Sequence, residues 1–203
     1  MSPDCATRFP WHAAEATLLP PLFPRLQLLL AMLLLLLAGT ARGDTITVNS
    51  AELLAEEDGY VLNAQFDFSF NPTLEEALQK GISLYFLLEF ELSRPRWYWV
   101  DEKVATLSVP YRLSYTPLTR QYRLGSGLLS QPFDSLEEVA RILGRVVSRT
   151  VLPREALTKG ARYEAAIRLR LDTAQLPKPF QIDALASRDW SLQSEWYRWS
   201  FTP

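Results

Sequence analysis

The sequence predicts a mainly β fold: an antiparallel β-sandwich, immunoglobulin-like or related, of about seven to nine strands with two short helices. Two observations support this prediction: long stretches alternate apolar and polar side chains, and turn residues separate those stretches. A third observation, an apolar run near the N-terminus that ends at small residues as an export signal does, predicts where the domain acts. A closed β-barrel is the alternative, because the same pattern suits a sheet that closes on itself.

The apolar run from Leu26 to Ala38 follows an arginine and is shorter than the roughly 20 residues of a membrane-spanning helix. It suits the core of a signal peptide, and the small residues after it favour cleavage after Ala41 or Gly43. We therefore expect residues 1–43 to be a leader and residues 44–203 to be a single exported β-rich domain in the periplasm of a Gram-negative cell. The alternative is an uncleaved anchor that tethers the domain to the inner membrane, facing the periplasm.

The leader holds the one cysteine of the chain, Cys5, and its one histidine, His12. Without them the domain has no disulfide, no thiolate nucleophile, no histidine base and no zinc site built on either residue. Loss of the leader removes three of 21 basic and two of 23 acidic residues, which leaves 18 against 21 and a net charge of −3. Because nucleic-acid binding needs a basic surface, we expect no nucleic-acid partner. We also expect a non-enzymatic domain with no cofactor and no metal.

Four stretches alternate with a period of two, which places their apolar residues on one face of a strand. One-sided alternation of this kind is typical of antiparallel sheets that have one face in water. The four predicted strands cover residues 60–70, 82–92, 107–115 and 163–171. Aromatic residues between 190 and 201 predict a terminal strand or two.

Turn residues join some of these strands in pairs. Glu57-Asp58-Gly59 predicts a tight hairpin between a strand at 46–55 and the strand at 60–70. Thr116-Pro-Leu-Thr119 predicts a second hairpin, which leads into a strand at 121–124. Gly125-Ser-Gly127 then loosens the chain.

Two capping boxes predict the helices. The spacing of Thr73 and Glu76 fits the motif in which a hydroxyl and a carboxylate bond each other's backbone amides, and Ser135-Leu-Glu-Glu138 repeats it. We expect one helix over 74–80, ending at a glycine, and one over 136–147. Pro177-Lys-Pro179 predicts a linker into the last segment.

The strongest candidate for a binding site is the segment Arg94-Pro-Arg-Trp-Tyr-Trp99. On a strand, Trp97 and Trp99 would share one face, with Arg96 and Tyr98 on the other. Arginine beside aromatic side chains can hold a carboxylate, a peptide or a carbohydrate. We therefore predict binding through Arg94, Arg96, Trp97, Tyr98 and Trp99. The alternative interpretation makes the tryptophans core or edge-strand residues and the arginines their solvated flanks.

Few other side chains are candidates for catalysis or binding. Glu89 and Glu91 share the polar face of one predicted strand, and a pair of carboxylates defines the alternative function, a hydrolase of cell-envelope glycans. Trp196-Tyr-Arg-Trp199 is a second aromatic cluster, which would enlarge the first if the two paired. The arginines and tyrosines of residues 111–124 are expected to pack across strands without a ligand.

The string Arg94-Pro-Arg-Trp-Tyr-Trp99 with Asp101-Glu-Lys103, followed by Tyr111-Arg-Leu-Ser-Tyr115 and Leu118-Thr-Arg-Gln-Tyr-Arg-Leu124, resembles a family of exported proteobacterial proteins. The family is the domain of unknown function 4390, also labelled proline-rich exported protein, and the resemblance covers Thr45 to Phe201. It implies no activity, cofactor or site residue. Its members are often encoded beside a membrane sensor histidine kinase, so the resemblance implies such an envelope or membrane protein as a partner.

Overall fold

The computed structural model describes residues 45–203, all of which belong to one compact unit. The predicted leader, with its apolar run Leu26–Ala38, lies outside the described residues. Within 45–203, no helix is both long enough and apolar enough to cross a bilayer.

The strands are β1 (Thr47–Glu56), β2 (Gly59–Asp67), β3 (Leu84–Arg94), β4 (Glu102–Thr116), β5 (Gln121–Ser126), β6 (Leu129–Phe133), β7 (Arg145–Leu152), β8 (Tyr163–Leu171) and β9 (Tyr197–Phe201). The helices are α2 (Pro72–Gln79), α3 (Leu136–Leu143) and α4 (Lys178–Ala186), with short 3₁₀ turns η1 (Arg154–Ala156), η2 (Thr173–Gln175) and η3 (Arg188–Trp190).

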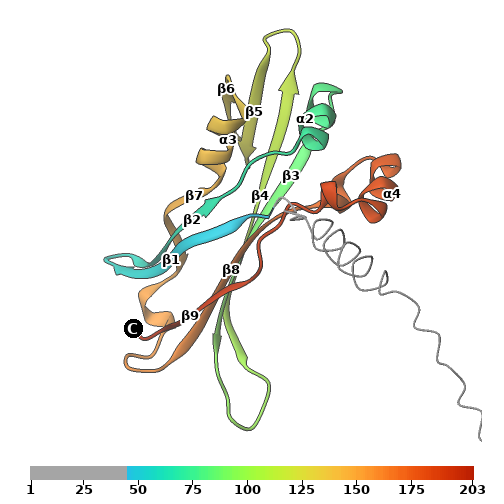
Figure 1. Ribbon diagram of the computed structural model, residues 1–203. Helices are drawn as coiled ribbons and strands as arrows, with labels where there is room; N and C mark the ends of the chain where they lie inside the picture. Colours follow the sequence, from blue (N-terminus) through green and yellow to red (C-terminus); the bar gives the residue numbers. More distant parts are fainter. Residues whose placement is uncertain (1–44) are drawn as a thin grey trace, which may run out of the picture. The chain divides into compact units, whose positions relative to one another are not determined.

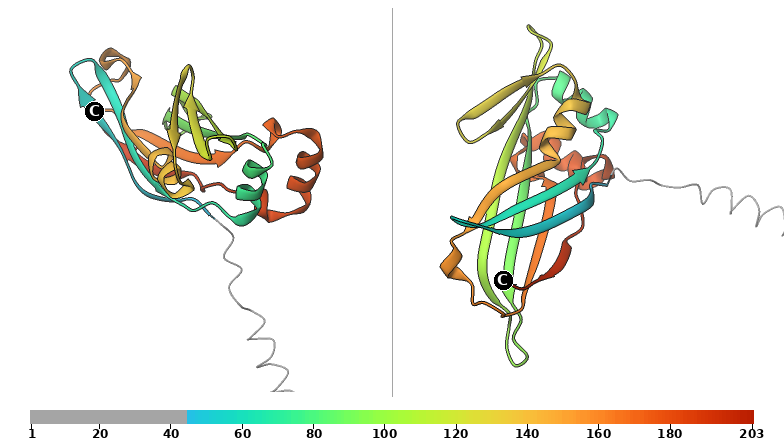
Figure 2. Two further views of the ribbon diagram at one scale, coloured as in Figure 1. Left: turned by 90° about the horizontal axis from the view of Figure 1, so that it is seen from above. Right: turned by 90° about the vertical axis from the view of Figure 1, so that its left-hand side faces the viewer.

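These strands form two antiparallel sheets (Figure 1). The smaller sheet has the order β1-β2-β7, and the larger has the order β6-β5-β4-β3-β8-β9. The smaller sheet lies against one face of the larger, with its strands crossing the long strands behind them (Figure 2). The prediction of a mainly β, sandwich-like fold is confirmed. The larger sheet ends at β6 and β9 and does not close, so the described residues form no barrel.

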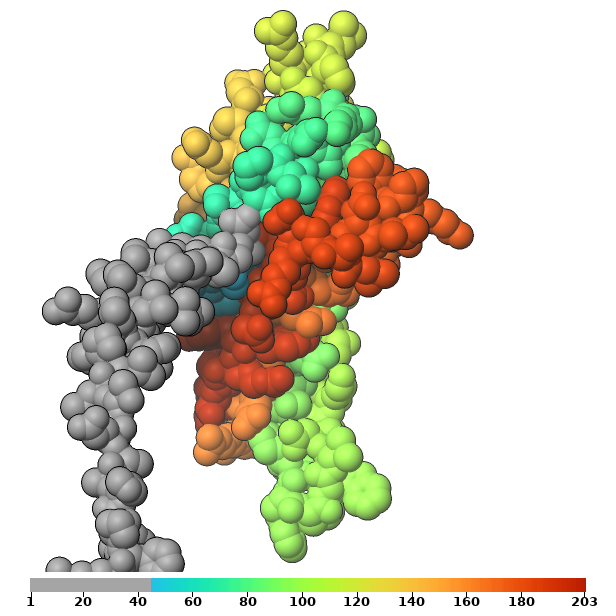
Figure 3. Space-filling view, turned by 45° about the vertical axis from the view of Figure 1, so that its right-hand side comes forward, coloured from blue at the N-terminus to red at the C-terminus, as the bar shows by residue number. Residues whose placement is uncertain are grey.

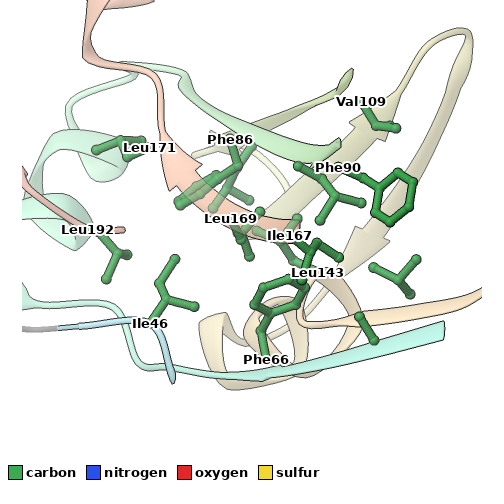
Figure 4. Close-up of a cluster of buried hydrophobic side chains, with 14 of the residues drawn as sticks. Ile46, Phe66, Phe86, Phe90, Val109, Leu143, Ile167, Leu169, Leu171 and Leu192 are labelled. Atoms are coloured by element: carbon green, nitrogen blue, oxygen red, sulfur yellow. The ribbon is translucent and has the colours of Figure 1, made fainter. Parts of the chain in front are cut away.

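The core lies between the two sheets, and Figure 4 shows its side chains converging from β2, β3, β8 and α3. The inner face of β3 is buried along its whole length, as its alternation predicts. β8 contributes a second fully buried row, and α2 and α3 cover the part of the face that the smaller sheet leaves open. The inward-facing residues of these two central strands are Leu84, Phe86, Leu88, Phe90, Leu92, Tyr163, Ala165, Ile167, Leu169 and Leu171.

Both predicted hairpins are present. Glu56 pairs with Gly59, so Glu57-Asp58 forms a two-residue turn between β1 and β2. Thr116 pairs with Gln121, which closes a four-residue turn between β4 and β5. The prediction that Gly125-Ser-Gly127 makes the chain irregular is wrong, because β5 continues to Ser126 and a turn follows it directly. Gly127, with φ of 63°, and Leu128 form a tight turn into β6, a strand that the sequence analysis missed.

The predicted helix over 136–147 is correct only for its first part. α3 ends at Leu143, and the chain from Arg145 onward forms β7, the third strand of the smaller sheet. Gly144 lies so close to β2 that a Cβ atom there would be 2.5 Å from the carbonyl oxygen of Phe66, and the Gly144 carbonyl accepts the Phe66 N–H at 2.7 Å. This contact ends the helix and directs the β-branched residues after it into the sheet.

The other helix predictions also need correction. The first helix begins at Pro72, and its N-cap is Asn71 rather than Thr73, because the Asn71 side chain accepts the Leu74 N–H. Its end is as predicted, just before Gly81, which has φ of 85°. Pro177-Lys-Pro179 is not a linker. It begins α4, because prolines suit the first turn of a helix, so the described chain has three α-helices instead of two.

The two N-caps allow a test of what holds the helical layer in place. Asn71 is buried, and its side-chain amide also donates to the Asp189 carbonyl at 2.7 Å, whereas Ser135 is an exposed cap that accepts only the Glu138 N–H. We expect Asn71→Ala to lower the free energy of unfolding by about 2–3 kcal/mol and Ser135→Ala by about 1 kcal/mol. Urea denaturation of both variants measures the difference, and equal losses would show that the Asp189 contact contributes nothing.

Candidate functional site

The predicted binding segment lies on the hairpin that joins β3 to β4. The last paired residues are Arg94 and Glu102, and residues 95–101 form the loop between them. The loop projects from one end of the domain (Figure 3). Trp97, Tyr98, Trp99 and Val100, here called the aromatic tip, have exposed fractions of 95%, 66%, 73% and 77%.

This arrangement differs from both interpretations of the sequence. The two tryptophans do not share the face of a strand, because they lie in the loop, and they are not core residues. Within the tip, the rings of Trp97 and Tyr98 meet edge to face with centroids 5.2 Å apart. The structure therefore brings the predicted aromatic residues together at an exposed projection.

The two predicted arginines have different roles at the base of the tip. Arg96 forms an ion pair with Glu102, and its backbone N–H donates to the carboxylate of Asp101 at 3.2 Å. Both acids are thus bonded to Arg96, and these bonds brace the loop. The exposed Arg94 side chain has no hydrogen-bond or ion-pair partner in residues 45–203.

The second aromatic cluster lies elsewhere. Trp199, on β9, is half-buried against Phe90 with ring centroids 6.2 Å apart, and Tyr197 lies beside it at 5.9 Å. Trp196 packs under the guanidinium of Arg168 at 4.5 Å. Between residues 45 and 203, no ring pair joins this cluster to the aromatic tip, so the two do not form one patch.

The outer face of the larger sheet carries an ion-pair network around Glu89. Its carboxylate, on β3, accepts from Arg168, the residue directly opposite on β8, and from the Nε of Arg170 at 3.1 Å. Arg170 also reaches Asp172 at 3.4 Å. Burial raises the pKa of Glu89, but the hydrogen bonds and charges of the two arginines outweigh it, so the pKa lies below the ordinary value. The predicted companion of Glu89, Glu91, pairs separately with the exposed Lys103.

The Arg- and Tyr-rich hairpin of β4 and β5 packs partly as predicted. Tyr115 and Tyr122 face each other across the strands with ring centroids 4.9 Å apart. Arg112 instead lies over Tyr85 of β3 at 6.0 Å and donates to Ser83. Beside Arg112 the sheet has a hollow of about 480 Å³, whose lining also includes Arg123.

A larger cavity, of about 1090 Å³, lies between the end of β2, the start of α2, β5 and α3. No predicted site residue lines it. The alternation through Phe70 predicted a longer strand, but β2 ends at Asp67, and Phe68 and Phe70, which follow it, line this cavity and pack on Phe86 of the core. Their rings pack on each other, with centroids 5.5 Å apart. The charged residues that line the cavity are Asp67, Glu75, Asp134, Glu137, Arg141 and Arg145.

One comparison with known proteins gives a match. A family model described as Domain of unknown function (DUF4390) matches residues 43–200. No curated protein and no solved structure matches the chain.

The Glu89 network predicts a pH dependence. A carboxylate with a lowered pKa stabilises the fold above its unfolded-state pKa, and this contribution is lost as the pH falls through the folded-state pKa. We expect Glu89→Gln to lower the free energy of unfolding by about 1–2 kcal/mol at neutral pH, and this deficit to shrink as the pH falls below about 4. Urea denaturation across this pH range measures it.

The matched control for that experiment is Glu91→Gln, on the same face of the same strand. Its exposed pair with Lys103 predicts a loss within about 0.5 kcal/mol at every pH. If the deficit of Glu89→Gln stayed constant as the pH fell, the network would not stabilise the fold through its charge.

Proposed function

The chain belongs to the family described as Domain of unknown function (DUF4390), and we propose, from the geometry of the candidate site, that it is a non-enzymatic binding or accessory domain of the cell envelope. The family description itself names no activity. The aromatic tip is its contact surface. The domain acts in the periplasm of a Gram-negative cell, where it meets a target at the membrane. The sensor kinase that the family resemblance implies is a candidate partner for the same domain.

The exposure of the aromatic tip carries this proposal. Four large apolar side chains in succession face water, and their most exposed member, Trp97, is 95% accessible. Contiguous exposed apolar groups are uncommon on soluble domains and mark interaction sites. Tryptophan, tyrosine and arginine are also the residues that most often dominate binding energy at interfaces. The free side chain of Arg94 adds a charged group at the edge of the surface.

The hydrolase alternative has less support. A general acid in a glycosidase needs a raised pKa, whereas the arginines around Glu89 lower it. The carboxylate of Glu91 forms an ion pair with Lys103 and does not share a site with Glu89. Binding therefore explains the exposed residues better than catalysis does.

Export itself gives a direct prediction. We expect the protein purified from a periplasmic extract to begin at Arg42 or Asp44, because the small residues of the leader favour cleavage just before either position. N-terminal sequencing measures this. Recovery from the membrane fraction with an intact leader would establish the tethered form, and recovery from the cytosol would contradict the proposal.

A photocrosslinking residue at position 98 tests the contact surface. We expect benzoylphenylalanine in place of Tyr98 to form adducts in the envelope of living cells, because the target lies against the tip. Benzoylphenylalanine in place of Leu118 is the control, since Leu118 is 94% exposed at the turn between β4 and β5. Mass spectrometry identifies each adduct as protein or lipid, and the same adducts from both positions, or none from 98, would refute a binding role for the tip.

A further inference from the structure

We propose that the target of the aromatic tip is the lipid bilayer itself, into whose headgroup boundary Trp97, Tyr98 and Trp99 insert. This inference rests on the proposed function, since it names the chemistry that the same surface recognises. The tip would hold the domain on the membrane surface. It would not span the bilayer, and no helix within residues 45–203 could do so.

The side chains of the tip suit the boundary between water and hydrocarbon. Tryptophan and tyrosine have a large apolar body and one polar group, and they concentrate at membrane interfaces for that reason. In the described chain, neither the indole N–H groups of Trp97 and Trp99 nor the Tyr98 hydroxyl has a hydrogen-bond partner. These three polar groups therefore remain available to headgroups and interfacial water while the rings enter the apolar layer. Val100 adds apolar surface next to them.

An unpaired cation at the base of the tip favours an anionic lipid surface. Of the three basic side chains in residues 94–103, Lys103 pairs with Glu91 and Arg96 with Glu102, and Arg94 has no ion-pair partner in the described chain. Both acids are bonded within the loop, to the side chain or backbone of Arg96, whereas Arg94 is unpaired. A cationic side chain near a membrane surface is attracted to acidic phospholipids. The tip thus presents aromatic rings with a cation at their base.

The shape of the tip favours a bilayer over a protein partner. A stable protein interface covers roughly 800 Å² on each partner, with a well-packed centre. The tip is the end of a single hairpin that projects from the body (Figure 3), so little flanking surface is available to complete such an interface. A bilayer accepts a narrow projection because its lipids move around it. The β3 and β4 strands, which are paired up to Arg94 and Glu102, make the projection stiff.

Fluorescence at the tip tests insertion. The experiment uses the full chain with Cys5→Ser and Tyr98→Cys, labelled at position 98 with an environment-sensitive fluorophore. With vesicles of phosphatidylethanolamine and phosphatidylglycerol, we expect its emission to shift to the blue and rise. The matched control is the label on Leu118→Cys, at the turn between β4 and β5, where we expect no shift. Because both chains carry the same N-terminal segment, a tether there affects both equally.

Further variants separate the contributions. Trp97→Ala with Trp99→Ala should abolish the blue shift at position 98, and Arg94→Gln should weaken it on anionic vesicles while leaving the response to pure phosphatidylcholine unchanged. If the label at 98 does not respond to vesicles, the lipid inference is overturned. In that case, protein adducts at position 98 in cells would keep the proposed function, and their absence would remove it as well.

Discussion

The fold depends on the double pairing of β3 at the centre of the larger sheet. Its inner face is a continuous row of buried leucine and phenylalanine side chains, and both of its edges are hydrogen-bonded, to β4 and to β8. A strand held in this way has one register, because a shift by one residue would turn its buried row into water. The smaller sheet and the helices are layers that cover this face. Without disulfides to limit the unfolded chain, this burial has to stabilise the domain.

The same strand also positions the candidate functional groups. Its outer face places Glu89 between Arg168 and Arg170, which ties β3 to β8 by charge as well as by backbone hydrogen bonds. Its end, together with the start of β4, carries the aromatic tip away from the body. Apolar side chains at such a place do not stabilise the domain, since they remain in water in the folded state. Their exposure is therefore better explained by a contact outside the chain.

The candidate site could be predicted from the sequence only in part. The concentration of arginine, tryptophan and tyrosine in residues 94–99 identified the segment, because composition alone makes it unusual. The sequence did not predict that Arg96 braces the loop while Arg94 stays free, since this depends on which acid lies across the hairpin. The cavity beside α3 was missed entirely. It lies where β2 ends at Asp67, and nothing in the local alternation marks that end, since Phe68 and Phe70 continue the apolar period.

The sequence by itself determined the class of the fold and its central strands, because a period of two that separates apolar from polar residues is compatible only with strands that have one buried face. It also determined the turns between β1 and β2 and between β4 and β5, and it shows that no cysteine or histidine follows His12. Only the tertiary structure decided where α3 stops, since that depends on the approach of Gly144 to the backbone of Phe66, a residue far away in the chain. It likewise decided that the tryptophans of the tip face water, because the pairing of β3 with β4 ends at Arg94 and Glu102 and leaves these residues in the loop, which no local pattern marks.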